Sequence, residues 1–381
     1  MNDDLDDTER QWRDSLARWL ADQDATLGTA PDAATVWRGL ARDLGLCGVG
    51  LPEAAGGLGG GLRAHLLALA TLGGWLRAEP YLTTALVAAG LLQGAAGMPL
   101  AAAWLPRVAD GAALLAWAHA EPGARGEAGD VACTLRRTPD GWRLSGTKAA
   151  VAAAPQADAL LVSARLDAGA PDHGAQALAV VLLDAAATGL VRTPVPLLDG
   201  SLAADLRFDD VAVPDGAVLY RGAAAQAAIE RALDQATLGH CAEALGVMQR
   251  LMADTLAHVR ERRQFGVPIA SFQALQHRLA DMHLAHAQAE ALTWAVAERL
   301  QDEANGDVDS DAADRALAVS SAKLAVDRAL RAVGQGAVQL HGAMGITEEL
   351  AVGRYFRRAT QLERLDGATS RHLRRIDRLQ D

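Results

Sequence analysis

The spacing of hydrophobic residues changes twice along the 381-residue chain, and no other feature limits the fold as much. In residues 1–115 apolar side chains recur at helical spacing, as Trp12 and Leu16 do. In residues 116–219 short apolar runs lie between Gly, Pro and Asp turns, which predicts a compact β-barrel or sandwich. Long helical patterns return in residues 220–381. We therefore expect a multi-region α+β fold with an N-terminal helical domain, a central β domain and a C-terminal four-helix bundle.

Composition and charge narrow the classes of protein to which the chain can belong. Half of its residues are hydrophobic but only 4% are aromatic, so alanine and leucine carry the burial, which favours helix over strand. The formal net charge of −11 argues against nucleic acid or an anionic membrane as the main partner. It does not oppose an anionic cofactor, which needs only local cations.

The three cysteines, Cys47, Cys133 and Cys241, are far apart and form no CxxC pattern. Neither a disulfide framework nor a structural zinc site is expected, the histidines form no metal cluster, and a cytoplasmic location follows. The acidic N-terminus is unlike a signal or transit peptide.

The stretch from Tyr81 to Leu105 carries no charge and is long enough to span a bilayer, which takes about 20 residues. It is rich in Ala, Gly and Thr, however, and contains Gln93 and Pro99. We therefore predict a buried helix over about Leu82–Gly94, a turn, and a second short helix.

The most informative short segment is Arg260–Leu275, where a long helical pattern stops at Gly266 and Pro268 and then restarts. A helix that ends in Arg-x-x-Phe-Gly leaves a guanidinium and an aromatic ring at an exposed turn, and such a pair can hold a phosphate and stack beside a flat ring. The spacing is equally compatible with an ordinary helix C-terminus, where arginines meet the negative end of the dipole and glycine caps the helix.

Two segments carry a resemblance that decides between these alternatives. Residues 262–282 resemble the signature of the acyl-CoA dehydrogenase family, and residues 337–350 resemble the same family's C-terminal flavin-contacting segment. Weaker similarity covers almost the whole chain. The resemblance implies an FAD-dependent dehydrogenation of an acyl-CoA thioester, in which a base removes the α-proton and the β-hydrogen leaves as hydride to flavin N5.

The resemblance also implies site residues. The adenine-dinucleotide half of FAD is expected to be bound, often across a subunit interface, by Arg262, Phe265, Gln273, Gln339, Gly342 and Ala343. On the substrate side, Gly126 is implied to lie near the CoA arm, and Asp234 is implied to face the CoA arm or solvent. Glu348 and Glu349 are further carboxylates near this segment, and His372, beside Arg371 and Arg374, is typical of a cationic helix end.

The family's base is usually a glutamate, and its position falls on Asp366 in this chain. Aspartate is one methylene shorter, so its oxygen reaches roughly 1–1.5 Å less far, and a misplacement near 1 Å can cost about 10²-fold in rate. Alternatively, Asp366 only turns the chain before Gly367. Some relatives place the base on the preceding long helix, but there Ala236 occupies the position and cannot serve.

The flavin-ring half of the implied site is depleted of polar side chains. The family's Thr-Glu-Pro-x-x-Gly-Ser stands here as Ala120-Glu-Pro-Gly-Ala-Arg-Gly126, and its Lys-x-Trp-Ile-Thr as Lys148-Ala-Ala-Val-Ala152. The threonine after the base is Ala368. Main-chain amides can still bind the ring, because they do not depend on the side chain.

Three hypotheses follow. The first is a self-sufficient acyl-CoA dehydrogenase with Asp366 as base, a homotetramer or homodimer that passes electrons to an electron-transferring flavoprotein. The second is a non-catalytic partner subunit of a heterotetramer with a homologous chain, which the alanines favour. The third is another flavoenzyme on the same fold, such as a flavin monooxygenase or desulfinase.

Overall fold

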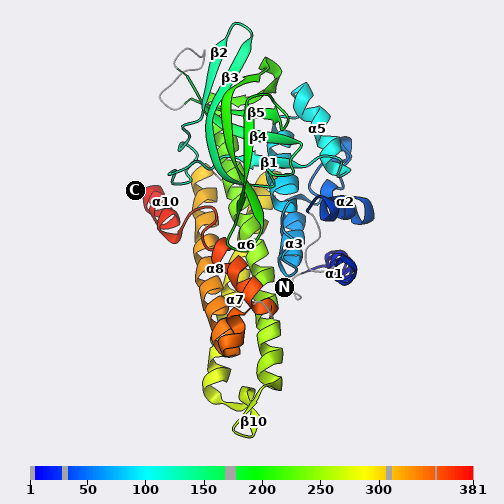
Figure 1. The fold of residues 1–381 in the computed structure, drawn as a ribbon, viewed down its shortest axis with the longest axis vertical. Helices are drawn as coiled ribbons and strands as arrows, with labels where there is room; N and C mark the ends of the chain where they lie inside the picture. Colours follow the sequence, from blue (N-terminus) through cyan, green and yellow to red (C-terminus); the bar gives the residue numbers. More distant parts are fainter. Residues whose placement is uncertain (1–4, 28–32, 168–176, 306–310, 348–349, 381) are drawn as a thin grey trace. The chain divides into compact units, whose positions relative to one another are not determined.

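The computed structural model describes residues 5–27, 33–167, 177–305, 311–347 and 350–380. Glu348 and Glu349 lie outside them. The chain forms two compact units, shown with the rest of the ribbon in Figure 1. The first comprises Met1–Thr26, Leu62–Ala78 and Thr237–Asp381, and the second Leu27–Gly61 and Glu79–Ala236. The three domain boundaries expected from the sequence remain a proposal.

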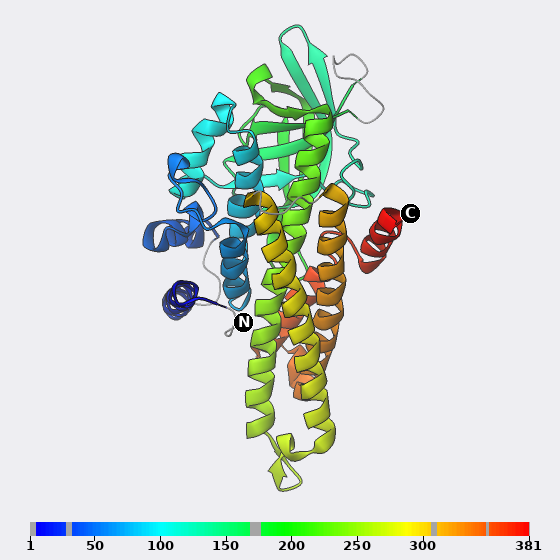
Figure 2. The ribbon, with the colours of Figure 1, turned by 180° about the vertical axis from the view of Figure 1, so that it is seen from behind.

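The first unit is helical. Its elements are α1 (Asp7–Leu27), α3 (Gly61–Gly73), the part of α6 (Gly222–Glu261) from Thr237 onward, β9 (Arg263–Gln264), β10 (Val267–Pro268), η5 (Ile269–Ser271), α7 (Gln273–Asn305), α8 (Ala312–His341), η6 (Gly342–Ile346), α9 (Ala351–Leu362) and α10 (Thr369–Gln380). Figures 1 and 2 show the long helices α6, α7 and α8 running side by side. Helices α9 and α10 contact α8, so the C-terminal part forms the expected helical bundle.

Local sequence explains where these helices stop. The break predicted at Gly266 and Pro268 is confirmed, because the chain there forms the small antiparallel hairpin β9–β10. Gly266 has φ +84°, a conformation that glycine adopts without strain. At the start of α8 the Asp311 carboxylate accepts a hydrogen bond from the amide of Asp314, as an N-cap does.

Glycine lets α3 and α6 approach each other closely. A Cβ atom added at Gly246 would lie 1.8 Å from the Ala70 carbonyl oxygen, and one added at Gly73 would lie 2.3 Å from that of Glu243. Nearby, the Tyr355 hydroxyl donates to the Gly74 carbonyl at 2.6 Å, which ties α9 to the end of α3.

The second unit contains the β-sheet. Its strands are β1 (Leu115–Ala118), β2 (Thr134–Thr138), β3 (Gly141–Ala152), β4 (Ala159–Leu166), β5 (Leu178–Asp184), β6 (Leu190–Pro196), β7 (Leu202–Val213) and β8 (Val218–Arg221). They form one eight-stranded sheet in the order β6-β7-β3-β2-β4-β5-β8, with β1 parallel to β4. The predicted central β region is thus confirmed.

The sheet follows the sequence pattern strand by strand. Strands β4 and β5 are buried along almost their whole length, as their continuous apolar runs predict. Strand β6, at the end of the sheet order, is mostly exposed. Strand β3 has two register shifts against β7, and within the second, between Lys148 and Val151, Ala150 has φ +49°. This β-bulge redirects the side chains around Lys148.

The remaining helices of the second unit include α2 (Ala33–Leu44), the π-helix η3 (Leu82–Ala88), α4 (Ala89–Gly94) and α5 (Pro99–Ala109). The uncharged stretch therefore forms the predicted helix, turn and second helix. Among the described residues, no helix is long and apolar enough to cross a membrane.

Candidate active site

Asp366 lies in the turn between α9 and α10. It has φ +58°, and Gly367 follows with φ +101°. The Asp366 carbonyl oxygen accepts hydrogen bonds from the Arg371 guanidinium and, at 3.2 Å, from the His372 ring. Asp366 therefore does turn the chain before Gly367, as one interpretation of the sequence held.

The same residue points its carboxylate at α6. Its Oδ2 lies 2.6 Å from Nδ1 of His240, and the two side chains are only 12% and 10% exposed. We assign the proton to Nδ1, because an ionised carboxylate can only accept. Turning the chain and presenting a carboxylate are thus compatible roles for Asp366.

Electrostatics favour an ionised Asp366 carboxylate and make the His240 imidazole more basic. Burial favours the neutral imidazole, yet the Asp366 carboxylate outweighs it and raises the pKa of His240 above its ordinary 6.5. Burial alone would likewise raise the pKa of Asp366, but His240 and two further cations hold it below its ordinary 3.8. The pair is a strongly coupled carboxylate and imidazole.

Sequence reasoning missed His240. It lies four positions after Ala236 on α6, so the two occupy the same face of the helix one turn apart. Ala236 is the position that some relatives are implied to use for the base. The only sequence signal was this spacing, and it becomes informative only once Asp366 is known to lie 2.6 Å away.

Other buried ion pairs surround the pair. The Arg358 guanidinium from α9 binds the Glu243 carboxylate of α6 through two contacts of 2.6 and 2.8 Å. On α8, Lys323 donates to Asp327 at 2.5 Å and to the Leu362 carbonyl at 2.8 Å. Burial raises the pKa of Asp327 to about 6, although Lys323 opposes the shift. The polar cluster is therefore held from several helices.

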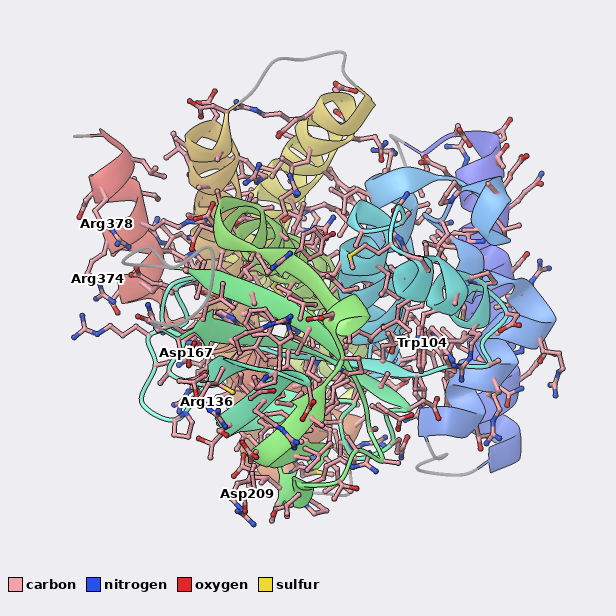
Figure 3. The ribbon with its side chains drawn as sticks, turned by 90° about the horizontal axis from the view of Figure 1, so that it is seen from above. Trp104, Arg136, Asp167, Asp209, Arg374 and Arg378 are labelled. Atoms are coloured by element: carbon pink, nitrogen blue, oxygen red, sulfur yellow. The ribbon has the colours of Figure 1, made fainter. Side chains whose placement is uncertain are left out.

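The basic residues of α10 lie on two faces. Arg371 and His372 are buried, with His372 Nδ1 3.2 Å from the Ser320 hydroxyl, whereas Arg374 and Arg378 are exposed and project outward (Figure 3). The cationic-helix-end interpretation of His372 is wrong, because α10 begins at Thr369 and His372 lies in its first turn. Burial lowers the pKa of His372 to about 4.

The residues implied to hold the dinucleotide are all exposed and gather where α6 and α8 end. They are Arg262, Phe265, Gln273, Gln339, Gly342 and Ala343. His258 of α6 stacks on His341 of α8 with ring centroids 4.2 Å apart, so the ends of these helices are adjacent. The structure thus brings Arg262 close to the Gln339–Gly342 segment.

Phe265 is unusual among these residues. Its side chain is 92% exposed at φ +52°, on the tip of the hairpin, and contacts Phe272 edge-on with centroids 6.2 Å apart. An aromatic ring left this open gains little from folding and is available for a ligand or partner.

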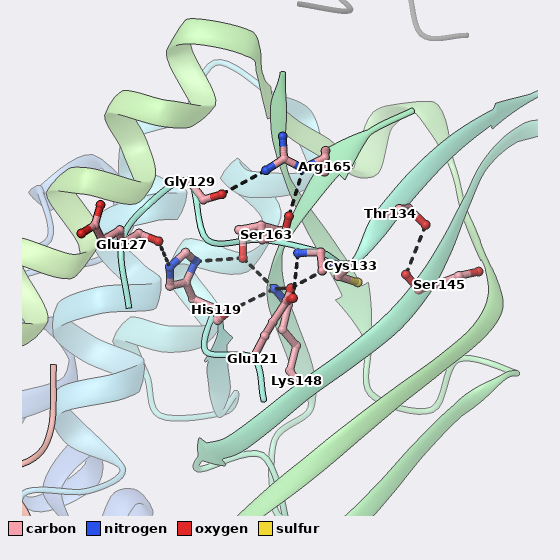
Figure 4. A network of polar contacts seen from close by, with 12 residues as sticks. His119, Glu121, Glu127, Gly129, Cys133, Thr134, Ser145, Lys148, Ser163 and Arg165 are labelled. Carbon is pink, nitrogen blue, oxygen red and sulfur yellow. Dashed lines mark hydrogen bonds and ion pairs between the residues drawn. The ribbon is translucent and has the colours of Figure 1, made fainter. Parts of the chain in front are cut away.

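In the sheet unit, the Lys and Glu of the two depleted motifs form a buried network (Figure 4). Lys148 Nζ donates to the Glu121 carboxylate at 2.7 Å, the Ser163 hydroxyl at 2.9 Å and the His119 carbonyl at 3.0 Å. Glu121 also accepts the amides of Ala132 and Cys133. Burial lowers the pKa of Lys148 despite the nearby Glu121. This network fixes strands and loops together.

Around this network, the positions implied to face the flavin ring offer few hydrogen-bonding groups. Ala120, Ala150 and Ala152 carry no polar group, and the amide of Ala150 donates to Asp205 at 2.8 Å. The amide of Ala149 donates to the Ala120 carbonyl at 2.8 Å. These two main-chain donors are therefore already engaged.

The two residues implied to lie near the CoA arm are Gly126, in a loop, and Asp234, inside a helix. Gly126 has φ +80° in a loop held by Asp130, whose carboxylate accepts the amide of Arg125 at 2.9 Å, so a serine there would be strained. Asp234 of α6 is 1% exposed, so the alternative that it faces solvent is wrong. In the part of the chain that the structure describes, no group of three or more His, Cys, Asp or Glu side chains could hold a metal ion.

Fold and site together define a class: a helical unit with a buried polar pair midway along α6 and a group of exposed residues suited to a dinucleotide where α6 and α8 end, and a separate β-sheet unit. Comparison with known families makes the class specific. Residues 6–112, 116–211 and 226–379 match the N-terminal, middle and C-terminal domains of acyl-CoA dehydrogenases. The chain belongs to the acyl-CoA dehydrogenase family, whose members are FAD-dependent oxidoreductases.

Individual relatives agree with this assignment. The chain is 30% identical to the mitochondrial short-chain specific acyl-CoA dehydrogenase of Sus scrofa over 266 residues, which is 70% of this chain and 62% of that protein. It thus spans about three fifths of that relative's length. Among solved structures, a variant of the Tcur3481-Tcur3483 steroid ACAD has TM-score 0.82 and 31% identity, covering 98% of this chain and 97% of that one. The ChsE4-ChsE5 complex from Mycobacterium tuberculosis has TM-score 0.83 and 27% identity, covering 99% and 98%.

The residues present fit one half of FAD and not the other. An exposed cation, an open aromatic ring and a glycine turn at the ends of α6 and α8 fit a pyrophosphate and adenine. On the sheet, three alanines and two engaged amides leave the flavin ring without the side-chain partners that the family resemblance implies. The ring half is the part of the site that a partner chain or other main-chain groups would have to supply.

Proposed function

We propose that the chain is an FAD-dependent oxidoreductase that dehydrogenates an acyl-CoA thioester between its α and β carbons. The observation that carries the proposal is the buried pair of His240 and Asp366, at 2.6 Å, where the family resemblance expects the α-proton base. FAD, when bound, supplies the acceptor for the β-hydride.

The chain's own residues have three tasks in this reaction. The His240–Asp366 pair takes the α-proton and keeps it in a site that excludes most water. Arg262 neutralises the pyrophosphate, while Phe265 covers the adenine-dinucleotide half and Gln273, Gln339, Gly342 and Ala343 provide polar and main-chain contacts. Gly126 and Asp234 lie near the CoA arm. Electrons then leave to an electron-transferring flavoprotein.

An anaerobic titration tests the proposal. The full-length chain with bound FAD is mixed with butyryl-CoA, isovaleryl-CoA or a steroid-side-chain CoA thioester, and flavin absorbance is followed. At least one thioester bleaches the flavin, and Asp366→Ala slows the bleaching by about 10²-fold or more without releasing FAD. No bleaching with any thioester, in protein that holds FAD, contradicts the proposal.

A second candidate is a non-catalytic partner subunit in a heterotetramer with a homologous chain. The alanines at 120, 150, 152 and 368 favour it. So do the similar solved structures of the Tcur3481-Tcur3483 steroid ACAD variant and the ChsE4-ChsE5 complex, each named for two proteins. The dinucleotide residues would then grip an FAD whose ring lies mostly against the partner. Co-expression with a homologous chain distinguishes this candidate from a homotetramer or homodimer, because only the heteromer would then turn over acyl-CoA.

Within the described residues, no contact favours a flavin monooxygenase or desulfinase. The cytoplasmic location expected from the cysteines also stays a prediction, since the Sus scrofa relative is named as mitochondrial.

A further inference from the structure

We propose that the imidazole of His240, and not the carboxylate of Asp366, accepts the α-proton, and that Asp366 is the residue that positions it. This inference rests on the proposed dehydrogenation and changes the identity of the base within it. Family resemblance places a carboxylate in that role, and nothing in the sequence singles out His240.

The geometry of the pair is that of an oriented imidazole. Asp366 Oδ2 engages Nδ1 at 2.6 Å, which fixes the ring and leaves Nε2 as the basic nitrogen. Among the described residues, no hydrogen bond is found to Nε2. A base that is held by a third group through its other nitrogen is the arrangement in which a carboxylate orients a histidine for proton transfer.

The turn that carries Asp366 makes it better suited to orienting than to reacting. Its backbone is held at φ +58°, and its carbonyl is bound by Arg371 and His372. Aspartate is also one methylene shorter than the glutamate that it replaces, whereas the His240 ring extends the reach of the pair. The low pKa of Asp366 and the raised pKa of His240 agree that the imidazole is the stronger base.

In the proton transfer the α C–H bond breaks, the proton forms an N–H bond at Nε2, and the electron pair stays on the substrate. That pair closes the α,β double bond when the β-hydrogen departs as hydride with its own electron pair, for which bound FAD would be the two-electron acceptor. The imidazolium that results is stabilised by the Asp366 carboxylate, and it later returns its proton to solvent.

The charged and titratable groups around the pair come from four helices. They are Cys241 and Glu243 on α6, Lys323 and Asp327 on α8, Arg358 on α9, and Arg371 and His372 on α10. Glu243 is bound by Arg358 and Asp327 by Lys323, so Asp366 is the carboxylate that contacts His240. Removing it leaves burial as the main influence on the imidazole and should lower its pKa.

The test compares His240→Gln, Asp366→Asn and the control His286→Gln in the full-length protein with the flavin and any partner it retains. His286 is a buried histidine of α7, 3.3 Å from the Leu245 carbonyl. One readout is uptake of deuterium from D₂O at the α carbon of the three thioesters, under anaerobic conditions and without electron acceptor. A second is ¹⁵N NMR of the histidine rings, assigned by the same variants.

We expect His240→Gln to reduce α-exchange by 10²- to 10⁴-fold, roughly the contribution of a general base. Asp366→Asn should retain more exchange than His240→Gln, by about tenfold or more, and should move the rising limb of its pH profile to lower pH. In NMR the neutral His240 ring should carry its proton on Nδ1 and titrate above 6.5, and Asp366→Asn should lower that pKa. His286→Gln should leave exchange unchanged.

Two results would overturn this inference but leave the proposed function standing. One is flavin bleaching and α-exchange that persist in His240→Gln but vanish in Asp366→Asn, which makes the carboxylate the base. The other is a neutral His240 ring protonated on Nε2, or one that titrates below 6.5. Absence of both bleaching and α-exchange in the unaltered protein rejects the proposed function, and the inference with it.

Discussion

At the scale of single residues, the His240–Asp366 pair should make the free energy of unfolding depend on pH. The pKa of His240 is raised. Its contribution to the free energy of unfolding is therefore full below pH 6.5 and is lost as pH rises through the folded-state pKa. The pKa of Asp366 is lowered, so its contribution is full above pH 3.8 and is lost as pH falls through the folded-state value.

Asp366→Asn should therefore lower the free energy of unfolding most between these two values. We expect a loss of about 1–3 kcal/mol there, typical of a hydrogen bond to a charged group, and a smaller loss at higher and lower pH. Urea unfolding across pH measures this. Asp377→Asn, at an exposed position of α10, is the control and should show no such maximum. A loss that is constant with pH would contradict the ionic nature of the pair.

The two members of the pair differ in how far sequence could reveal them. Asp366 follows from counting along a local motif, because the motif and the residue share one stretch of chain. His240 is 126 positions away and has no motif of its own. Only the packing of the α9–α10 turn on α6 brings it into contact, and a single sequence does not encode that contact in a readable pattern.

At the scale of elements, the buried contact between α9 and α6 depends on Arg358. The Glu243 side chain is 1% exposed, so Arg358→Met would leave its carboxylate buried without its main partner. Breaking one side of such a pair costs about 3–5 kcal/mol. Thermal unfolding should show the loss, and the further change Glu243→Gln should recover part of it. Arg354→Met, exposed on the same helix, should change stability little.

The close approach of α3 and α6 gives a second prediction at this scale. Gly246→Ala would place a Cβ atom 1.8 Å from the Ala70 carbonyl, so the helices must separate, at a cost of about 1–3 kcal/mol. Gly216→Ala has no atom within 4 Å of the added carbon and should be nearly neutral. Equal melting temperatures for the two variants would show that α3 and α6 are not packed this tightly.

Sequence patterns predicted the elements well and their pairing poorly. The helix break near Gly266, the strands β4, β5 and β7, and the helices around Leu82–Gly94 all follow from apolar spacing and from Gly or Pro. The parallel pairing of β1 with β4 and the bulge at Ala150 do not, because they depend on which distant strands meet. The engaged amides beside that bulge were also missed.

At the scale of the whole molecule, cofactor binding should depend on side chains that folding does not need. Arg262→Ala should weaken FAD binding about 10- to 100-fold, since a charge-assisted hydrogen bond contributes about 1.5–3 kcal/mol. Phe265→Ala should also weaken it, while the melting temperature of the flavin-free protein stays the same, because the ring is 92% exposed. Equilibrium titration with FAD measures both, with Arg374→Ala as control. Unchanged affinity in Arg262→Ala and Phe265→Ala would place the dinucleotide elsewhere.

We propose that this chain is itself a flavin-dependent dehydrogenase, although the ring half of its site is poor in polar side chains. The most direct test is the visible absorption spectrum of the full-length chain, purified alone, before and after anaerobic addition of the three thioesters. We expect a flavin spectrum near one FAD per chain that at least one thioester bleaches. A colourless protein that becomes yellow only with a homologous partner would contradict it and identify the chain as half of a shared site.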